Sequence, residues 1–113
     1  MRYSRYDIVK VPFPFTDKPA NKFRPALVIS DATKFNSVIE HSVMAMITSA
    51  KHSNWPLDTV IGDLSSAGLP VSSVIRFKLF TLDHRLIVDK LGYLSNADQI
   101  EFDRNFRIMT GWT

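Results

Sequence analysis

The chain carries many short apolar runs, and turn-forming residues separate each run from the next. Apolar runs of about four to eight residues between such breaks are typical of β-strands, and several in succession favour a small barrel or a strongly bent sheet. The run at 25–30 is nearly continuous in Ala, Leu, Val and Ile, which predicts a strand buried on both faces. The predicted strands are residues 7–13, 25–30, 42–48, 58–61, 73–79, 80–82 and 85–90, with a bend between the fifth and the sixth.

The segments between these strands are predicted to be loops and turns. The first strand should stop at the Pro-Phe-Pro-Phe stretch of residues 12–15, because proline cannot donate to a β-ladder. Residues 31–40 are expected to form a loop with a helical turn, and residues 50–56 another loop. Gly62 and Asp63 predict a turn.

The last element is predicted to be a helix. Ser95 is a suitable N-cap, and Asp98 three residues later resembles a capping box in which aspartate replaces glutamate. Gly111 is a suitable C-terminal stop. The large apolar residues of this segment recur at helical spacing and so share one face: Phe102, Phe106 and Met109. The pattern as a whole predicts a mainly β fold with a C-terminal helix packed on a barrel-like sheet.

Composition narrows the class of protein. The chain has 113 residues, which predicts a single domain over residues 1–113. It has no cysteine, which excludes disulfides and thiolate metal sites and fits a reducing compartment. It shows no signal-peptide stretch and no run long enough to span a bilayer, so we expect a soluble cytoplasmic protein. The net charge of +3 suits a polyanionic ligand, although many small proteins are equally basic.

Several kinds of chemistry have no support in the sequence. His41, His52 and His84 are widely separated and form no metal-ligand spacing, so each is expected to be a surface or loop residue. The chain has only four glycines and no glycine-rich phosphate loop. It also lacks the GxSxG motif of serine hydrolases. We therefore expect neither a metal nor a cofactor.

Arg24 and the pair Thr48-Ser49 remain as candidates for chemistry. Arg24 stands where a polar loop becomes an apolar strand, and Thr48 stands where another apolar strand becomes a loop. We expect antiparallel pairing of these strands to keep the two ends apart, whereas parallel strands or a bend in the barrel would bring them together. The plain alternative is that Arg24 is a surface residue and that Thr48 closes a turn.

The order of motifs along the chain strongly resembles the MazF/PemK toxin family. The first signature is residues 7–17, followed by the Lys-x-Arg-Pro-Ala-Leu-Val-Ile-Ser run of residues 22–30. The other segments that carry the resemblance are Ile47-Thr48-Ser49, Ser73-Val74-Ile75, Thr81-Leu82-Asp83 and the run from Lys90 to Ser95. Each motif is short, and the specificity lies in their combination and order.

The resemblance implies a small SH3-like barrel of the MazF/PemK/CcdB type, a homodimer and a protein antitoxin as partner. It implies metal-independent cleavage of single-stranded RNA by the RNA's own 2′-hydroxyl. Arg24 and Thr48 match the family's key residues, and a bidentate guanidinium with a hydroxyl suits the charge that develops on the phosphate oxygens. We therefore expect both side chains to face one groove, close enough to share a phosphate.

RNA binding should also need basic and aromatic side chains in the neighbouring loops. The candidates are Phe15, Lys18, Lys22, Ser49, Lys51 and His52. His52 is also a candidate for the general base. Lys78 and Phe80 stand where many family members have glutamine and arginine. This departure leaves open an alternative: a non-catalytic module on the same fold that binds nucleic acid or a topoisomerase.

Overall fold

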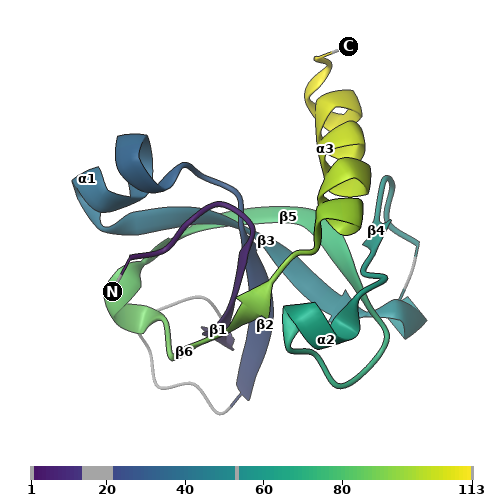
Figure 1. Ribbon diagram of the computed structural model, residues 1–113, viewed down its shortest axis with the longest axis horizontal. Helices are drawn as coiled ribbons and strands as arrows, with labels where there is room; N and C mark the ends of the chain where they lie inside the picture. The colour runs from purple at the N-terminus through teal and green to yellow at the C-terminus, as the bar shows by residue number, and fades with distance from the viewer. Residues whose placement is uncertain (1, 14–21, 53, 113) are drawn as a thin grey trace.

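The computed structural model describes residues 2–13, 22–52 and 54–112, and this part of the chain forms one curled antiparallel sheet with a long C-terminal helix (Figure 1). The strands are β1 (Asp7–Phe13), β2 (Lys22–Val28), β3 (His41–Ser49), β4 (Thr59–Val60), β5 (Ser73–Asp83) and β6 (Asp89–Tyr93). Their order in the six-stranded sheet is β4-β5-β3-β2-β1-β6, and neighbours are antiparallel. The predicted fold class, mainly β with a C-terminal helix, is confirmed, and the curled sheet forms a half-barrel.

Short helical segments connect the strands. They are η1 (Ala32–Asn36), α1 (Ser37–Ile39), η2 (Ala50–His52), α2 (Leu64–Ala67) and η3 (His84–Leu86), and the chain then forms α3 (Asn96–Thr110). Figure 1 shows α3, β4 and α2 together on one side of the molecule and α1 on the opposite side. None of the helices in the described residues has the length and apolar character needed to cross a membrane.

The second strand begins earlier than predicted, at Lys22 rather than Pro25, and it ends at Val28. The apolar run alone marked the predicted start, although the β1 ladder already includes Lys22, which pairs with Phe13. Pro25 is tolerated inside the strand because the ladder between β2 and β3 begins only at Ala26. Arg24 therefore lies within a strand and not at its boundary with a loop.

Two further strand predictions need correction. The two segments predicted at 73–79 and 80–82 form the single strand β5, and a bulge at residues 77–78 takes the place of the expected bend. The strand predicted at 85–90 is wrong in position, because Asp83 accepts a hydrogen bond from the backbone nitrogen of Arg85 at 2.9 Å and caps the turn η3. The strand β6 follows only at Asp89.

Apolar side chains cover both faces of the sheet and form two cores. We call the face that packs against the C-terminal helix the α3 face, and the opposite one the Tyr3 face. The α3 face carries Ile8, Leu27, Ala45, Ile47 and Ile75, packed against Phe102. The Tyr3 face carries Val9, Val11, Ala26, Val28 and Met44, packed against Tyr3. The alternation of side chains along each strand assigns its residues to these two faces.

The start of α3 is held in a way that the sequence predicted only in part. The Ser95 hydroxyl accepts a hydrogen bond from the backbone nitrogen of Asp98 at 3.3 Å, so Ser95 is the N-cap as predicted. The predicted capping box is wrong for the Asp98 side chain, which should have accepted a hydrogen bond from the backbone nitrogen of Ser95. The Asp98 carboxylate accepts hydrogen bonds from the backbone nitrogens of Gly62, at 3.0 and 3.1 Å, and Asp63, at 3.0 Å. Asp98 thus joins α3 to the turn that leads into α2.

Candidate functional site

A groove of about 440 Å³ lies at the end of the sheet where β2 begins and β3 ends. We call it the Arg24 groove, because Arg24 and Thr48 both line it, as do Lys10, Phe23 and Ser49. The rest of its lining is small or apolar, from β2, β3, β5, β6 and the connection between α2 and β5. Among the described lining residues there are two cationic side chains and no carboxylate.

The register of β2 and β3 brings Arg24 and Thr48 together. Ala26 pairs with Met46 in this antiparallel ladder, and the same register continued by two residues sets Arg24 opposite Thr48. The expectation that antiparallel pairing would separate these positions was wrong, because the start of one antiparallel strand lies beside the end of its neighbour. Alternation also assigns Arg24 and Thr48 to the same face of the sheet, the Tyr3 face.

The guanidinium of Arg24 lies against an aromatic ring. Its central carbon is 4.9 Å from the centroid of the Phe13 ring, which belongs to the neighbouring strand β1. Such a contact fixes the plane of a guanidinium while its N–H groups point outward at the edge. Arg24 Nε is buried and has no hydrogen-bond partner among the described residues. A buried donor without a partner costs free energy.

The remaining predicted site residues differ in where they lie. Thr48 is 7% exposed and pairs with Val74 of β5. Ser49 lines the groove, and its hydroxyl accepts a hydrogen bond from the backbone nitrogen of Lys51 at 3.3 Å. Lys51 and Lys22 are exposed, the latter at the first position of β2. Phe15, Lys18 and the side chain of His52 lie outside the described part of the structure.

Phe23 and Lys10 are groove residues that the sequence analysis did not select. They lie on the α3 face and enter the groove because it opens at the sheet end, where residues of both faces line it. Phe23 precedes Arg24 directly, so the register of β1 with β2 would have pointed to it. That register could not be obtained from the apolar pattern, which began the second strand too late.

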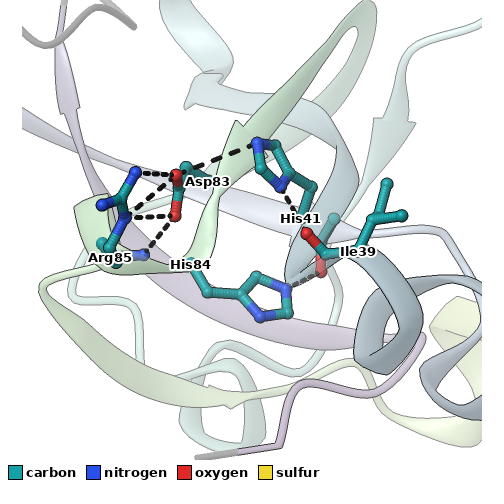
Figure 2. Close-up of polar contacts among 6 residues, drawn as sticks. Ile39, His41, Asp83, His84 and Arg85 are labelled. Atoms are coloured by element: carbon teal, nitrogen blue, oxygen red, sulfur yellow. Dashed lines mark hydrogen bonds and ion pairs between the residues drawn. The ribbon is translucent and has the colours of Figure 1, made fainter.

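A second cavity, of about 470 Å³, lies at the opposite end of β3 and contains two histidines (Figure 2). His41 and His84 were predicted to be separate surface residues, but the pairing of His41 with Asp83 brings them together. His41 Nδ1–H donates to the carbonyl oxygen of Ile39 at 2.8 Å, and its Nε2 lies 3.9 Å from Asp83 Oδ2. His84 Nε2 lies 2.7 Å from the Ser42 hydroxyl.

The histidine cavity does not have the composition of a polyanion site. Two of its lining residues, Glu40 and Asp83, are carboxylates. Hydrogen bonds from Arg85 lower the pKa of Asp83 to about 2, so this carboxylate is charged at neutral pH. The described residues include no cluster of three groups that could hold a metal ion. A third cavity, beside Trp55, is lined by the carboxylates of Asp58 and Glu101.

The stability of the protein is expected to fall as the pH decreases below about 6.5, and His84 should contribute to this fall. Burial of the ring, with the nearby His41, lowers the pKa of His84 from its ordinary value. The unfolded chain then binds a proton that the folded chain resists, so the free energy of unfolding decreases on acidification. Urea midpoints of wild type and His84→Gln, measured near pH 7.5 and pH 5.5, test this. A smaller decrease in the variant is expected, and an equal decrease would contradict the prediction.

Comparison with known proteins identifies the family. A model of PemK-like, MazF-like toxins of type II toxin–antitoxin systems matches residues 4–110, and the chain belongs to this family of toxins. Curated proteins give no match.

Solved structures of toxins share the fold. An endoribonuclease in complex with its cognate antitoxin, from a Mycobacterial species, has a TM-score of 0.77 and 15% identity, with 98% of this chain and 97% of that one covered. The MazE–MazF complex (Form II) from Deinococcus radiodurans has a TM-score of 0.76 and 21% identity, with 100% and 99% covered. The Mycobacterium tuberculosis toxin MazF-mt6 has a TM-score of 0.73 and 15% identity, with 95% and 98% covered.

Proposed function

We propose that this toxin is a metal-independent endoribonuclease that cleaves single-stranded RNA in the Arg24 groove. The observation that carries the proposal is the position of Arg24 and Thr48, which stand opposite each other in the continued β2–β3 register and line one groove. The described lining residues of this groove include cations and no carboxylate, whereas the histidine cavity and the cavity beside Trp55 each contain two carboxylates. This uncompensated positive charge attracts a phosphodiester.

The proposed reaction is an internal transfer at phosphorus. The ribose 2′-hydroxyl loses its proton as its oxygen attacks the adjacent phosphorus, and the bond to the 5′-oxygen breaks as that oxygen takes up a proton. The products are a 2′,3′-cyclic phosphate and a free 5′-hydroxyl. Negative charge builds up on the non-bridging oxygens in the transition state. The Arg24 guanidinium and the Thr48 hydroxyl donate hydrogen bonds to these oxygens.

Arg24 is assigned to charge stabilisation and not to proton abstraction. A guanidinium keeps its proton at any physiological pH, so it cannot act as a general base. Its N–H groups can donate hydrogen bonds to the leaving 5′-oxygen as well as to the phosphate oxygens. The exposed Lys22 and Lys51 flank the groove's two central strands and extend its positive charge toward the rest of the RNA strand.

We further propose that a cognate antitoxin binds this toxin and covers the same groove, and that the toxin acts in the cytoplasm as a homodimer. Two of the solved toxins that share the fold are complexes with an antitoxin, which supports a protein partner. A groove with positive charge and an apolar wall suits an antitoxin segment that combines acidic and apolar side chains.

The test is to incubate the purified toxin with a long RNA in EDTA and to sequence the products. We expect cuts at a small set of short sequences in single-stranded regions, with 2′,3′-cyclic phosphate and 5′-hydroxyl ends. Binding of RNA without cleavage at any toxin concentration would contradict the proposal and favour a non-catalytic module. Cleavage that requires an added divalent cation would contradict the proposed chemistry.

A further inference from the structure

The Arg24 groove contains an aromatic ring to which neither the family resemblance nor the proposed reaction assigns a role. Phe23 is 47% exposed and stands directly before Arg24 in β2. The ammonium nitrogen of Lys10, on β1, lies 5.5 Å from the centroid of the Phe23 ring. Both residues line the groove. An exposed ring beside a cation is the combination with which proteins hold single-stranded nucleic acid.

The wall around this ring is apolar. Leu69, Pro70 and Val71, from the connection between α2 and β5, line the groove together with Leu91 of β6. The hydroxyl of Ser73 donates a hydrogen bond to the carbonyl oxygen of Val71 at 2.8 Å, so its proton is not available to a ligand. A flat, largely apolar ligand suits such a wall, and a volume of about 440 Å³ falls within the range of small-molecule pockets.

We propose that Phe23 is a stacking platform for the base of a nucleotide next to the scissile phosphate, with Lys10 contacting the RNA backbone beside it. This inference rests on the proposed function, because it places the scissile phosphate at Arg24 and Thr48. Alternation along β2 assigns the Phe23 side chain to the α3 face and the Arg24 side chain to the Tyr3 face, and both residues line the groove at the start of β2. The RNA strand therefore passes over the start of β2, with its phosphate on one face and a base on the other.

Trp55 is another exposed aromatic ring near cations, and its surroundings favour Phe23 as the primary platform. Its ring is 38% exposed, and the side chains of Arg76 and Lys78 lie 5.7 and 5.2 Å from its centroid. Arg76 is paired with Asp58 at 2.8 Å, and the adjoining cavity is lined by Asp58 and Glu101. Each of these carboxylates is paired with an arginine, Asp58 with Arg76 and Glu101 with Arg104, so the charges offset each other. The described lining of the Arg24 groove contains no carboxylate to offset its cations.

Stacking on Phe23 should tolerate any of the four bases, because every base presents an aromatic face. The contribution should depend on the presence of the base and only weakly on its identity. Phe23→Ala should lower single-turnover cleavage or RNA affinity by roughly tenfold, the scale of one lost base stack. Phe23→Tyr keeps a ring and should stay close to wild type.

The experiment is a cycle that combines protein variants with abasic RNA. A short RNA with a mapped cut is made in versions that lack one base at a time on either side of the cut. With wild type, one abasic position should cost roughly tenfold. With Phe23→Ala, removing that same base should cause no further loss of cleavage or affinity, while removal of a base at the other positions should have the same effect as with wild type. Phe35→Ala, a ring 38% exposed in η1 and not among the groove residues, is the matched control and should cleave normally.

The outcomes separate this inference from the proposed function. If wild type does not cleave RNA, the proposed function fails. If wild type cleaves and Phe23→Ala, folded by its melting curve, cleaves intact RNA equally well, the stacking platform is overturned. The stacking platform is also overturned if the loss caused by Phe23→Ala simply adds to the loss caused by each missing base, at every position. Loss of antitoxin binding with unchanged cleavage would also overturn it and would assign Phe23 to the protein partner.

Discussion

Replacing Arg24 with alanine is expected to slow RNA cleavage by roughly 100- to 1,000-fold, which is the usual loss when one preorganised donor to a developing oxyanion is removed. The side chain has no ion-pair partner among the described residues, and its Nε has no hydrogen-bond partner there. Its removal therefore breaks no described hydrogen bond or ion pair and loses only the contact with the Phe13 ring, so the melting temperature should fall only modestly. The measurement is single-turnover cleavage of a mapped RNA.

Four further variants test this prediction. Arg24→Lys keeps the charge but loses the planar fork, so it should recover only part of the rate. Thr48→Ala should lose activity, and Thr48→Ser, which keeps the hydroxyl, should retain most of it. Arg85→Ala removes an arginine whose side chain is 89% exposed and which lines the histidine cavity, so it should cleave at the wild-type rate. An Arg24→Ala variant that cleaves as fast as wild type would contradict the proposed role.

Replacing Asp98 with alanine is expected to destabilise the protein by about 3 kcal/mol, because hydrogen bonds to a charged group contribute about 1.5–3 kcal/mol each. Asp98 is 7% exposed and accepts from the backbone nitrogens of Gly62 and Asp63. For a chain of this size such a loss corresponds to a decrease of about 10 °C in melting temperature. Urea unfolding and thermal melts measure it.

A neighbouring residue in the same helix provides the control. Glu101→Ala removes an exposed carboxylate that pairs with Arg104 at 2.8 Å, three residues along α3, and exposed pairs of this kind contribute at most about 0.5 kcal/mol. The Asp98 effect should exceed the Glu101 effect several-fold. Equal effects would show that Asp98 does no more than an ordinary surface carboxylate.

The sequence predicted the elements of the fold better than their pairing. The spacing of apolar residues located β1, β3 and α3 closely, and Ser95 and Gly111 marked the ends of the helix as expected. Lys22 and Phe23 belong to no apolar run, so the start of β2 could not be found from the pattern. The short helix α2 is held by Asp63, which accepts from the backbone nitrogen of Ser66, and four residues are too few to show a period.

The candidate site was predictable only as a set of separate residues. The family resemblance selected Arg24 and Thr48, but their position relative to each other follows from the β2–β3 register, which the sequence does not display. The same limit applies to His41 and His84, which lie far apart in sequence and meet through the pairing of β3 with β5. The sequence pattern predicted that the Asp98 carboxylate would cap the start of its own helix. In the fold it accepts hydrogen bonds from the backbone nitrogens of Gly62 and Asp63, which are far away in the sequence.

The most direct test of the proposed chemistry is a single change in the RNA and not in the protein. An RNA with one mapped cut is made again with a 2′-deoxyribose at the nucleotide whose 2′-oxygen should attack. We expect wild type to bind this RNA as before and to leave it uncut at that position, even at long times and in EDTA. Cleavage of the 2′-deoxy substrate at the same bond would contradict an internal attack at the Arg24–Thr48 site.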